Sequence, residues 1–295
     1  MKKQLFLSSL IFPLMIFSMG LPTGTEFSWP VPIDNEESEI FDAIEFSKDI
    51  EPLSEEFCDH MIATAPMEVQ EVINLLINPE TRIKELPKTL MFFGATGNGK
   101  SDLAHVIAQK MKMPFLIVPA VFLKNEYASS AVRGLEVLGK IATAIKGNVV
   151  IDDINFFMRK NKNNLFVPEA KALNELLNII VAQKLLFIGT YIEVPNMPIN
   201  LQQKFMGTIY EIPFIKDKKI ISQVIHFYLK KNVIESSEVI ERLSNDMQGS
   251  SNREIEQTVC IALRFAAHRN KKSPVLIYQD FKKAIAQLEQ NERLF

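Results

Sequence analysis

Hydrophobic residues from about residue 66 onward follow two alternating periods. Short runs in which nearly every residue is apolar predict buried strands at residues 89–93, 115–118, 148–151, 185–189 and 210–214. Before and between these runs, apolar residues three and four positions apart predict helices at residues 69–77, 101–111, 132–145 and 170–183. Because apolar strands that alternate with helices are typical of a parallel sheet covered on both faces, this part of the chain is predicted to be an α/β domain.

The pattern changes after Pro213, where no further apolar run predicts a strand. Four amphipathic helices are predicted instead, at residues 218–230, 237–247, 252–268 and 278–288. The predicted architecture is therefore a parallel sheet sandwiched by helices over residues 66–214, followed by a small all-α domain over residues 215–295.

The first 65 residues differ from the rest of the chain. Lys2 and Lys3 precede an apolar stretch at residues 5–21, which predicts a signal peptide or a membrane anchor over residues 1–21. A hydrophobic helix that packs on the protein is the alternative. Residues 22–65 are rich in proline and then in acidic residues, and they are predicted to form a linker.

The strand predicted at residues 89–93 runs into a glycine-rich segment, which fits the phosphate-loop pattern G-x-x-x-x-G-K-[ST] between a strand and a helix. Its residues are Gly94, Ala95, Thr96, Gly97, Asn98, Gly99, Lys100 and Ser101. Glycines let backbone N–H groups turn towards phosphate oxygens, and the lysine adds a positive charge. The hydroxyl of Ser101 suits Mg²⁺. The segment predicts a site for a nucleoside triphosphate with Mg²⁺, and a glycine-rich turn that only caps the helix is the alternative.

Two aspartates follow the strand predicted at residues 148–151. Asp152 is the candidate Mg²⁺ ligand, because a carboxylate at the end of a neighbouring strand supplies the kind of oxygen that this ion prefers. Asp153 is placed to polarise an attacking water, as a base or an orienting group. An aspartate pair that merely starts a turn is the alternative interpretation.

These features together resemble the AAA+ ATPases over about residues 66–290. Residues 72–94 are similar to the family's usual approach to its Walker A loop, Asp152-Asp153 resembles the Walker B motif, and the C-terminal helices resemble the lid. The resemblance implies a P-loop NTPase fold that binds ATP and Mg²⁺. It also implies ATP hydrolysis coupled to remodelling of a protein substrate by a homo-oligomer, a ring or partial ring.

The resemblance implies roles for three further residues. Thr190 matches the sensor 1 position, where a polar side chain contacts the γ-phosphate or the attacking water, although Tyr191 stands where many members have Asn. Arg253 matches sensor 2, which couples the lid to the nucleotide state. Tyr127 falls where many members carry the aromatic residue of a substrate-gripping pore loop. A capped strand end, a solvated arginine paired with a nearby glutamate and a packed surface aromatic are the respective alternatives.

Three positions depart from the family pattern. Ala95 replaces a frequent proline, Asp153 replaces a glutamate, and residues 201–205, where members usually carry arginine fingers, contain Lys204 but no arginine. The shorter Asp153 and the missing arginines affect hydrolysis more than binding. A nucleotide-binding switch or scaffold subunit with weak or no hydrolysis is therefore the alternative function.

Composition restricts the partners further. The formal net charge of −2 and the pI of about 6.2 give no overall basic field, so a DNA loader is disfavoured and no nucleic acid is expected. The order of the C-terminal helices disfavours a small-molecule kinase. Cys58 and Cys260 form no metal-binding pair. Localisation stays open, because residues 5–21 indicate membrane association or export, whereas ATP use indicates a cytoplasmic body.

Overall fold

The computed structural model describes residues 45–46, 52–78, 86–123, 130–158, 167–193, 197–230, 232–271 and 274–292. The chain divides into two compact units, Met1–Ser38 and Glu39–Phe295, and every described residue belongs to the second. The predicted signal peptide or anchor, most of the predicted linker and Tyr127 lie outside the described residues. No helix within the described ranges has the length and apolar character needed to cross a membrane.

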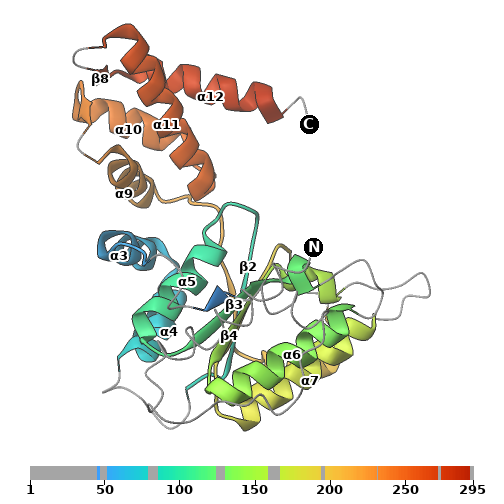
Figure 1. The fold of residues 1–295 in the computed structure, drawn as a ribbon. Helices are drawn as coiled ribbons and strands as arrows, with labels where there is room; N and C mark the ends of the chain where they lie inside the picture. The colour runs from blue at the N-terminus through green and yellow to red at the C-terminus, as the bar shows by residue number, and fades with distance from the viewer. Residues whose placement is uncertain are drawn as a thin grey trace, which may run out of the picture. The chain divides into compact units, whose positions relative to one another are not determined.

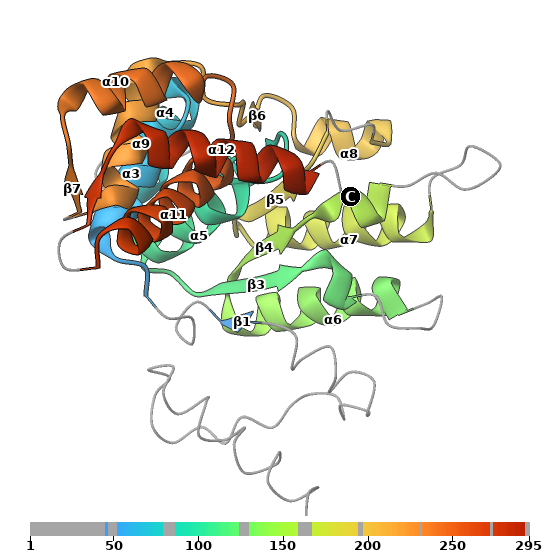
Figure 2. The ribbon, with the colours of Figure 1, turned by 90° about the horizontal axis from the view of Figure 1, so that it is seen from above.

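A six-stranded sheet forms the centre of the first part of this unit, with the strand order β1-β3-β4-β5-β2-β6 (Figures 1 and 2). The strands are β1 (Glu45–Phe46), β2 (Thr89–Phe93), β3 (Phe115–Pro119), β4 (Asn148–Asp152), β5 (Phe187–Tyr191) and β6 (Ile209–Glu211). All neighbours pair in parallel except β1, which runs antiparallel to β3 at the edge. The predicted parallel sheet is thus confirmed, and β1 is an additional edge strand.

Helices cover both faces of this sheet, which explains why the central strands are almost continuously buried. The helices α4 (Met67–Ile77) and α5 (Lys100–Met111) lie together, and α6 (Ser130–Ile145) packs against α7 (Pro168–Ala182) (Figure 1). Shorter helical elements are η2 (Ala120–Leu123), η3 (Ile154–Met158) and α8 (Ile199–Lys204). The four helices predicted for this part of the chain are present, with ends shifted by at most two residues.

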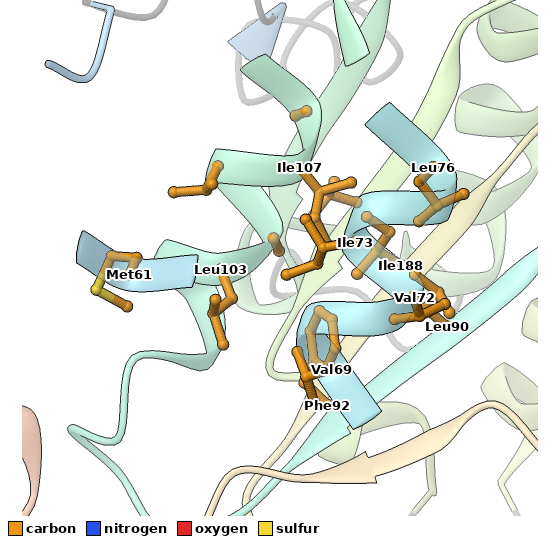
Figure 3. Packing of buried hydrophobic residues seen from close by; sticks show 14 of the residues in the cluster. Met61, Val69, Val72, Ile73, Leu76, Leu90, Phe92, Leu103, Ile107 and Ile188 are labelled. Carbon is orange, nitrogen blue, oxygen red and sulfur yellow. The ribbon is translucent and has the colours of Figure 1, made fainter. Parts of the chain in front are cut away.

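The helix α3 (Glu55–Thr64) lies within the range that the sequence predicts as a linker. It contributes Cys58 and Met61 to the core that also holds Leu103 of α5, and Figure 3 shows Met61 beside Leu103. Its acidic residues are exposed and the chain before it is proline-rich. The sequence therefore gives little sign of the two buried residues on its apolar face. For residues 55–64 the linker prediction is therefore wrong.

The chain from Lys218 onward forms helices with a hydrophobic core of their own. These are α9 (Lys218–Leu229), α10 (Ser237–Asp246), α11 (Asn252–Arg269) and α12 (Tyr278–Glu292). The prediction of an all-α region is wrong in one detail, since β7 (Val233–Ile234) pairs in parallel with β8 (Val275–Leu276). Two residues are too few to show a strand period in the sequence.

Candidate nucleotide-binding site

The phosphate loop connects β2 to α5, and glycine conformations shape it. Gly94, Gly97 and Gly99 have φ angles of 143°, 88° and 88°, values that L side chains rarely adopt. A Cβ atom on Gly94 would lie 2.3 Å from the carbonyl oxygen of Ile212, the residue directly after β6. The loop therefore depends on glycine both for its turn and for its close approach to the neighbouring chain.

The helix α5 begins at Lys100 with free backbone donors. Its N-cap, Gly99, supplies no side-chain acceptor, so the first N–H groups of the helix remain available to an anion. Lys100 is only 6% exposed, and its Nζ donates to the carbonyl oxygen of Ala95 at 2.9 Å. Burial lowers the pKa of Lys100, and the negative charges of Asp153 and Asp152 oppose this shift. The loop thus holds a lysine beside its own backbone and near two carboxylates.

Asp152, at the carboxyl end of β4, accepts hydrogen bonds from two other side chains. Its Oδ1 accepts a hydrogen bond from Ser101 Oγ at 2.7 Å and another from Thr190 Oγ1. Ser101 stands at the start of α5 and Thr190 in β5, so three separate elements deliver these groups. A carboxylate beside a hydroxyl is a donor set that Mg²⁺ accepts, and this ion retains waters for its other positions.

The candidate metal ligands are oxygens, the hydroxyl of Ser101 and the carboxylate of Asp152, which are the ligand type that Mg²⁺ prefers. Within the described ranges, no three His, Cys, Asp or Glu side chains gather in one cluster. Such a cluster would suit a transition metal or calcium, whereas Mg²⁺ commonly uses one or two carboxylates together with substrate phosphates. The residues present therefore fit Mg²⁺.

Asp153 takes a left-handed backbone conformation, with φ at 57°. Its N–H donates to Thr190 Oγ1 at 2.8 Å. Burial raises the pKa of the Asp153 carboxyl, the charge of Asp152 raises it further, and Lys100 opposes both effects. The structure thus brings Asp153, Asp152 and Lys100 into one electrostatic group.

The two neighbours at the end of β5 differ in what they contribute. Thr190 is fully buried, and its hydroxyl contacts both aspartates. Tyr191 contributes its carbonyl oxygen, which accepts from the N–H of Gly94 at 3.2 Å. Of the two residues between which the sequence leaves the sensor 1 assignment open, Thr190 is the one whose side chain meets the aspartates.

The start of α11 also touches the phosphate loop. The N–H of Arg253 donates to the carbonyl oxygen of Gly97 at 3.1 Å, and Asn252 Nδ2 donates to the carbonyl oxygen of Asn98 at 3.4 Å. A capping box formed by Ser251 and Glu254 fixes this end of the helix. The backbone of Arg253 is therefore placed at the loop, while its side chain is exposed.

Asn98, which the sequence predicts as part of the loop, makes a contact that the sequence did not predict, and Met61 and Asn252 were missed as residues that surround the loop. Asn98 Nδ2 donates to the carbonyl oxygen of Ile212 at 2.8 Å, and a Cβ on Gly99 would lie 2.7 Å from the terminal methyl group of Met61. Asn252 was missed as well, although it directly precedes Arg253. These contacts join segments that are distant in the sequence, so no local sequence pattern predicts them. Lys204 lies at the end of α8, where its carbonyl oxygen accepts from the hydroxyl of Thr89.

Comparisons with known proteins show which family and which relatives this chain resembles. The family described as "ATPase family associated with various cellular activities (AAA)" matches residues 90–212. A proteasome-activating nucleotidase of Saccharolobus solfataricus is 25% identical over 222 residues, covering 70% of this chain and 56% of that protein. The ATP-dependent zinc metalloprotease FtsH of Karelsulcia muelleri is 24% identical over 225 residues, covering 69% of this chain and 35% of that protein. Spastin of Ixodes scapularis is 28% identical over 85 residues, or 28% of this chain and 13% of that protein. The aligned region thus spans about half or less of each relative's length.

Proposed function

Because this chain belongs to the AAA+ ATPase family, we propose that it binds ATP with Mg²⁺ and hydrolyses it to remodel a protein substrate. The observation that carries the proposal is the convergence of Ser101, Asp152 and Thr190 beside the phosphate loop. A loop that only capped a helix would not require a hydroxyl and a carboxylate from two other strands at its mouth.

In the proposed binding step, the loop receives the phosphates of ATP. Its N–H groups and the start of α5 donate to phosphate oxygens, and Lys100 Nζ exchanges the Ala95 carbonyl for a phosphate oxygen. Ser101 and Asp152 would hold Mg²⁺, which supplies positive charge to the phosphate oxygens when bound. Because the buried Lys100 ammonium changes only its hydrogen-bond acceptor, its charge keeps a partner throughout.

In the proposed hydrolytic step, Asp153 orients the attacking water and accepts its proton. Burial raises the pKa of the Asp153 carboxyl, and the ionised carboxylate is the proposed proton acceptor. Arg253, whose backbone already contacts Gly97, would link the nucleotide to the helical domain from Lys218 onward. We propose that this domain acts as a lid that responds to the bound nucleotide.

The protein partners follow from family membership. The proposed assembly is a ring or partial ring of identical chains that acts on a polypeptide, with Tyr127 as a substrate contact and with membrane association through residues 5–21. Relatives named for proteasome activation and for proteolysis support a protein substrate. Nucleic acid is not part of the proposal, in keeping with the net charge of −2.

A second function is favoured by the hydrolytic half of the site. Asp153 is one methylene shorter than the family's glutamate, and residues 201–205 contain no arginine. These features support a nucleotide-binding switch or scaffold subunit with weak or no hydrolysis.

One experiment separates the two functions. ATP and ADP binding to the full-length protein would be measured by calorimetry with and without Mg²⁺, and phosphate release would be followed over a range of protein concentrations. A remodelling ATPase predicts turnover per chain that rises as oligomers form, whereas a switch predicts tight binding with flat, very slow turnover. Absence of ATP binding would contradict both proposals.

A further inference from the structure

Backbone pairing between β4 and β5 stops before the two aspartates. The paired residues run from Val149–Phe187 to Ile151–Gly189, so no ladder bond reaches Asp153. Two side chains continue the connection beyond this point. The N–H of Asp153 donates to Thr190 Oγ1 at 2.8 Å. In the opposite direction, the N–H of Ile192 donates to Asn155 Oδ1 at 3.3 Å.

The chain between these two bonds needs such support because Asp153 is left-handed, with φ at 57°. Within the described part of the chain, the other non-glycine residues with positive φ all follow the end of a helix, namely Lys112, Lys146, Lys184 and Lys230. Asp153 instead follows a strand. Aspartate and asparagine occupy this conformation more readily than glutamate, because their short polar side chains bond locally.

The hydroxyl of Thr190 has a single hydrogen to donate. That hydrogen goes to Asp152 Oδ1, while a lone pair of the same oxygen accepts the N–H of Asp153. Thr190 is fully buried. With its one donor committed to Asp152, this side chain has no hydrogen left for a phosphate oxygen.

We infer that Thr190 and Asn155 are positioning residues, which hold Asp152 and Asp153 in place from β5 instead of contacting the nucleotide. The inference rests on the proposed ATPase function and changes the role of Thr190 within it. It also explains the aspartate at position 153, because a left-handed turn held by Thr190 carries the shorter acid more easily than glutamate.

The test uses the full-length protein with Thr190→Val, which keeps the shape and removes the hydroxyl, and with Thr190→Ser, which keeps the hydroxyl. Calorimetry gives the affinities for ATP and ADP with and without Mg²⁺, and phosphate release gives kcat. For Thr190→Val we expect kcat to fall about 100-fold and the gain in ATP affinity from Mg²⁺ to shrink. The Mg²⁺-free affinity and the ratio of ATP to ADP affinity should stay unchanged. Thr190→Ser should recover most of the lost kcat.

The opposite result would be a selective loss of ATP affinity relative to ADP in Thr190→Val, which would place the hydroxyl on the γ-phosphate and overturn the inference. A Thr190→Val protein with the kcat and Mg²⁺ response of the unaltered chain would overturn it as well. Thr258→Val is the matched control, because Thr258 is 1% exposed and is a buried threonine of α11, outside the candidate site. Failure of the unaltered protein to bind or hydrolyse ATP would instead contradict the proposed function.

Two further variants test the turn itself. Asn155→Ala removes the second bond and should lower kcat by about threefold to tenfold, while Asn155→Asp keeps an acceptor and should lose less. Asp153→Glu should lower kcat, since the longer acid must adopt the left-handed turn. A rise in kcat on Asp153→Glu would show that the turn does not select aspartate and would contradict this part of the inference.

Discussion

The phosphate loop and the carboxyl ends of β4 and β5 form two halves of one candidate site, and they are built differently. The loop, residues 94–101, is contiguous and takes its shape from glycine backbone conformations. At the strand ends, hydrogen bonds of the hydroxyl of Thr190 in β5 join it to Asp152 and Asp153, which end β4 and follow it. A loop that depends on glycine backbone angles accepts few substitutions. A network of hydrogen-bonded side chains can accept a different residue at one position if its neighbours adjust. In this chain Ala95 leaves the glycine, lysine and serine positions of the loop pattern intact, whereas Asp153 changes an acidic residue at the strand ends.

The largest expected effect concerns the backbone of the loop. Gly94→Ala places a Cβ 2.3 Å from the Ile212 carbonyl oxygen at a φ of 143°. We expect the free energy of unfolding to fall by roughly 3 kcal/mol or more, with loss of ATP binding. Gly207→Ala is the control, because Gly207 has a φ of 76° with no atom within 4 Å of the new Cβ. Its cost should be about 1 kcal/mol, from φ alone. Equal losses in chemical denaturation would contradict the account.

Single charges should separate the two halves by function. Lys100→Ala removes the buried ammonium, and we expect ATP affinity to fall about 100-fold, because charge-assisted hydrogen bonds to phosphate are lost. Asp153→Asn keeps the left-handed turn and should lower kcat about 100-fold while leaving ATP affinity within about threefold. Lys171→Ala, on an exposed lysine of α7, is the control for the first variant. If Asp153→Asn weakened binding as much as Lys100→Ala, the division into two halves would be wrong.

We expect folding stability to depend on pH through His60 in α3, the helix whose Met61 lies next to the phosphate loop. His60 of α3 stacks on Phe227 of α9 with ring centroids 4.2 Å apart, and its buried Nε2 has no hydrogen-bond partner among the described residues. Burial lowers the pKa of His60 to about 4 from an ordinary value of 6.5. Below pH 6.5 the unfolded chain therefore binds a proton that the folded chain resists.

Stability from neutral His60 should thus be complete above about pH 6.5 and should be lost progressively as the pH falls towards 4. We expect this loss to be roughly 1–3 kcal/mol. His60→Phe keeps a ring against Phe227 and should flatten this part of the profile, measured by denaturation at a series of pH values. An unchanged slope in His60→Phe would assign the pH dependence to other groups.

The smallest expected effect concerns the ion pairs that join α3 to α5. Lys110 Nζ lies 3.0 Å from Asp59 Oδ1 and also contacts Glu55, but both carboxylates are well exposed to solvent. Lys110→Met should therefore change the free energy of unfolding by less than about 1 kcal/mol. A larger loss would show that charge, and not the buried face of Cys58 and Met61, holds α3 in place.

Most of the sheet and its helices could be predicted from the sequence, because apolar periodicity reports burial directly. The strand β5 shows the limit. The apolar run predicts it at residues 185–189, and the structure has Phe187–Tyr191, because Leu185 still bonds through its N–H to Ile180 of α7. This shift places Thr190 inside the strand, paired with Phe92 of β2.

The candidate site was predictable where its residues are contiguous or match a family position. The bonds from Asp153 to Thr190 and from Ile192 to Asn155 were not, because they depend on strand register and on where a ladder ends. The contact between Met61 and Gly99 was hidden for another reason, since α3 lies in a segment whose acidic residues mask its apolar face.

The central claim is that residues 94–101 bind the phosphates of ATP together with Mg²⁺ held near Ser101 and Asp152. Calorimetric titration of ATP into the full-length protein, with and without Mg²⁺, tests this claim most directly. The account predicts one ATP bound per chain, tighter binding with Mg²⁺, and loss of that gain in Asp152→Ala while metal-free binding persists. Binding that is absent, or that is equally tight with and without Mg²⁺, would contradict it.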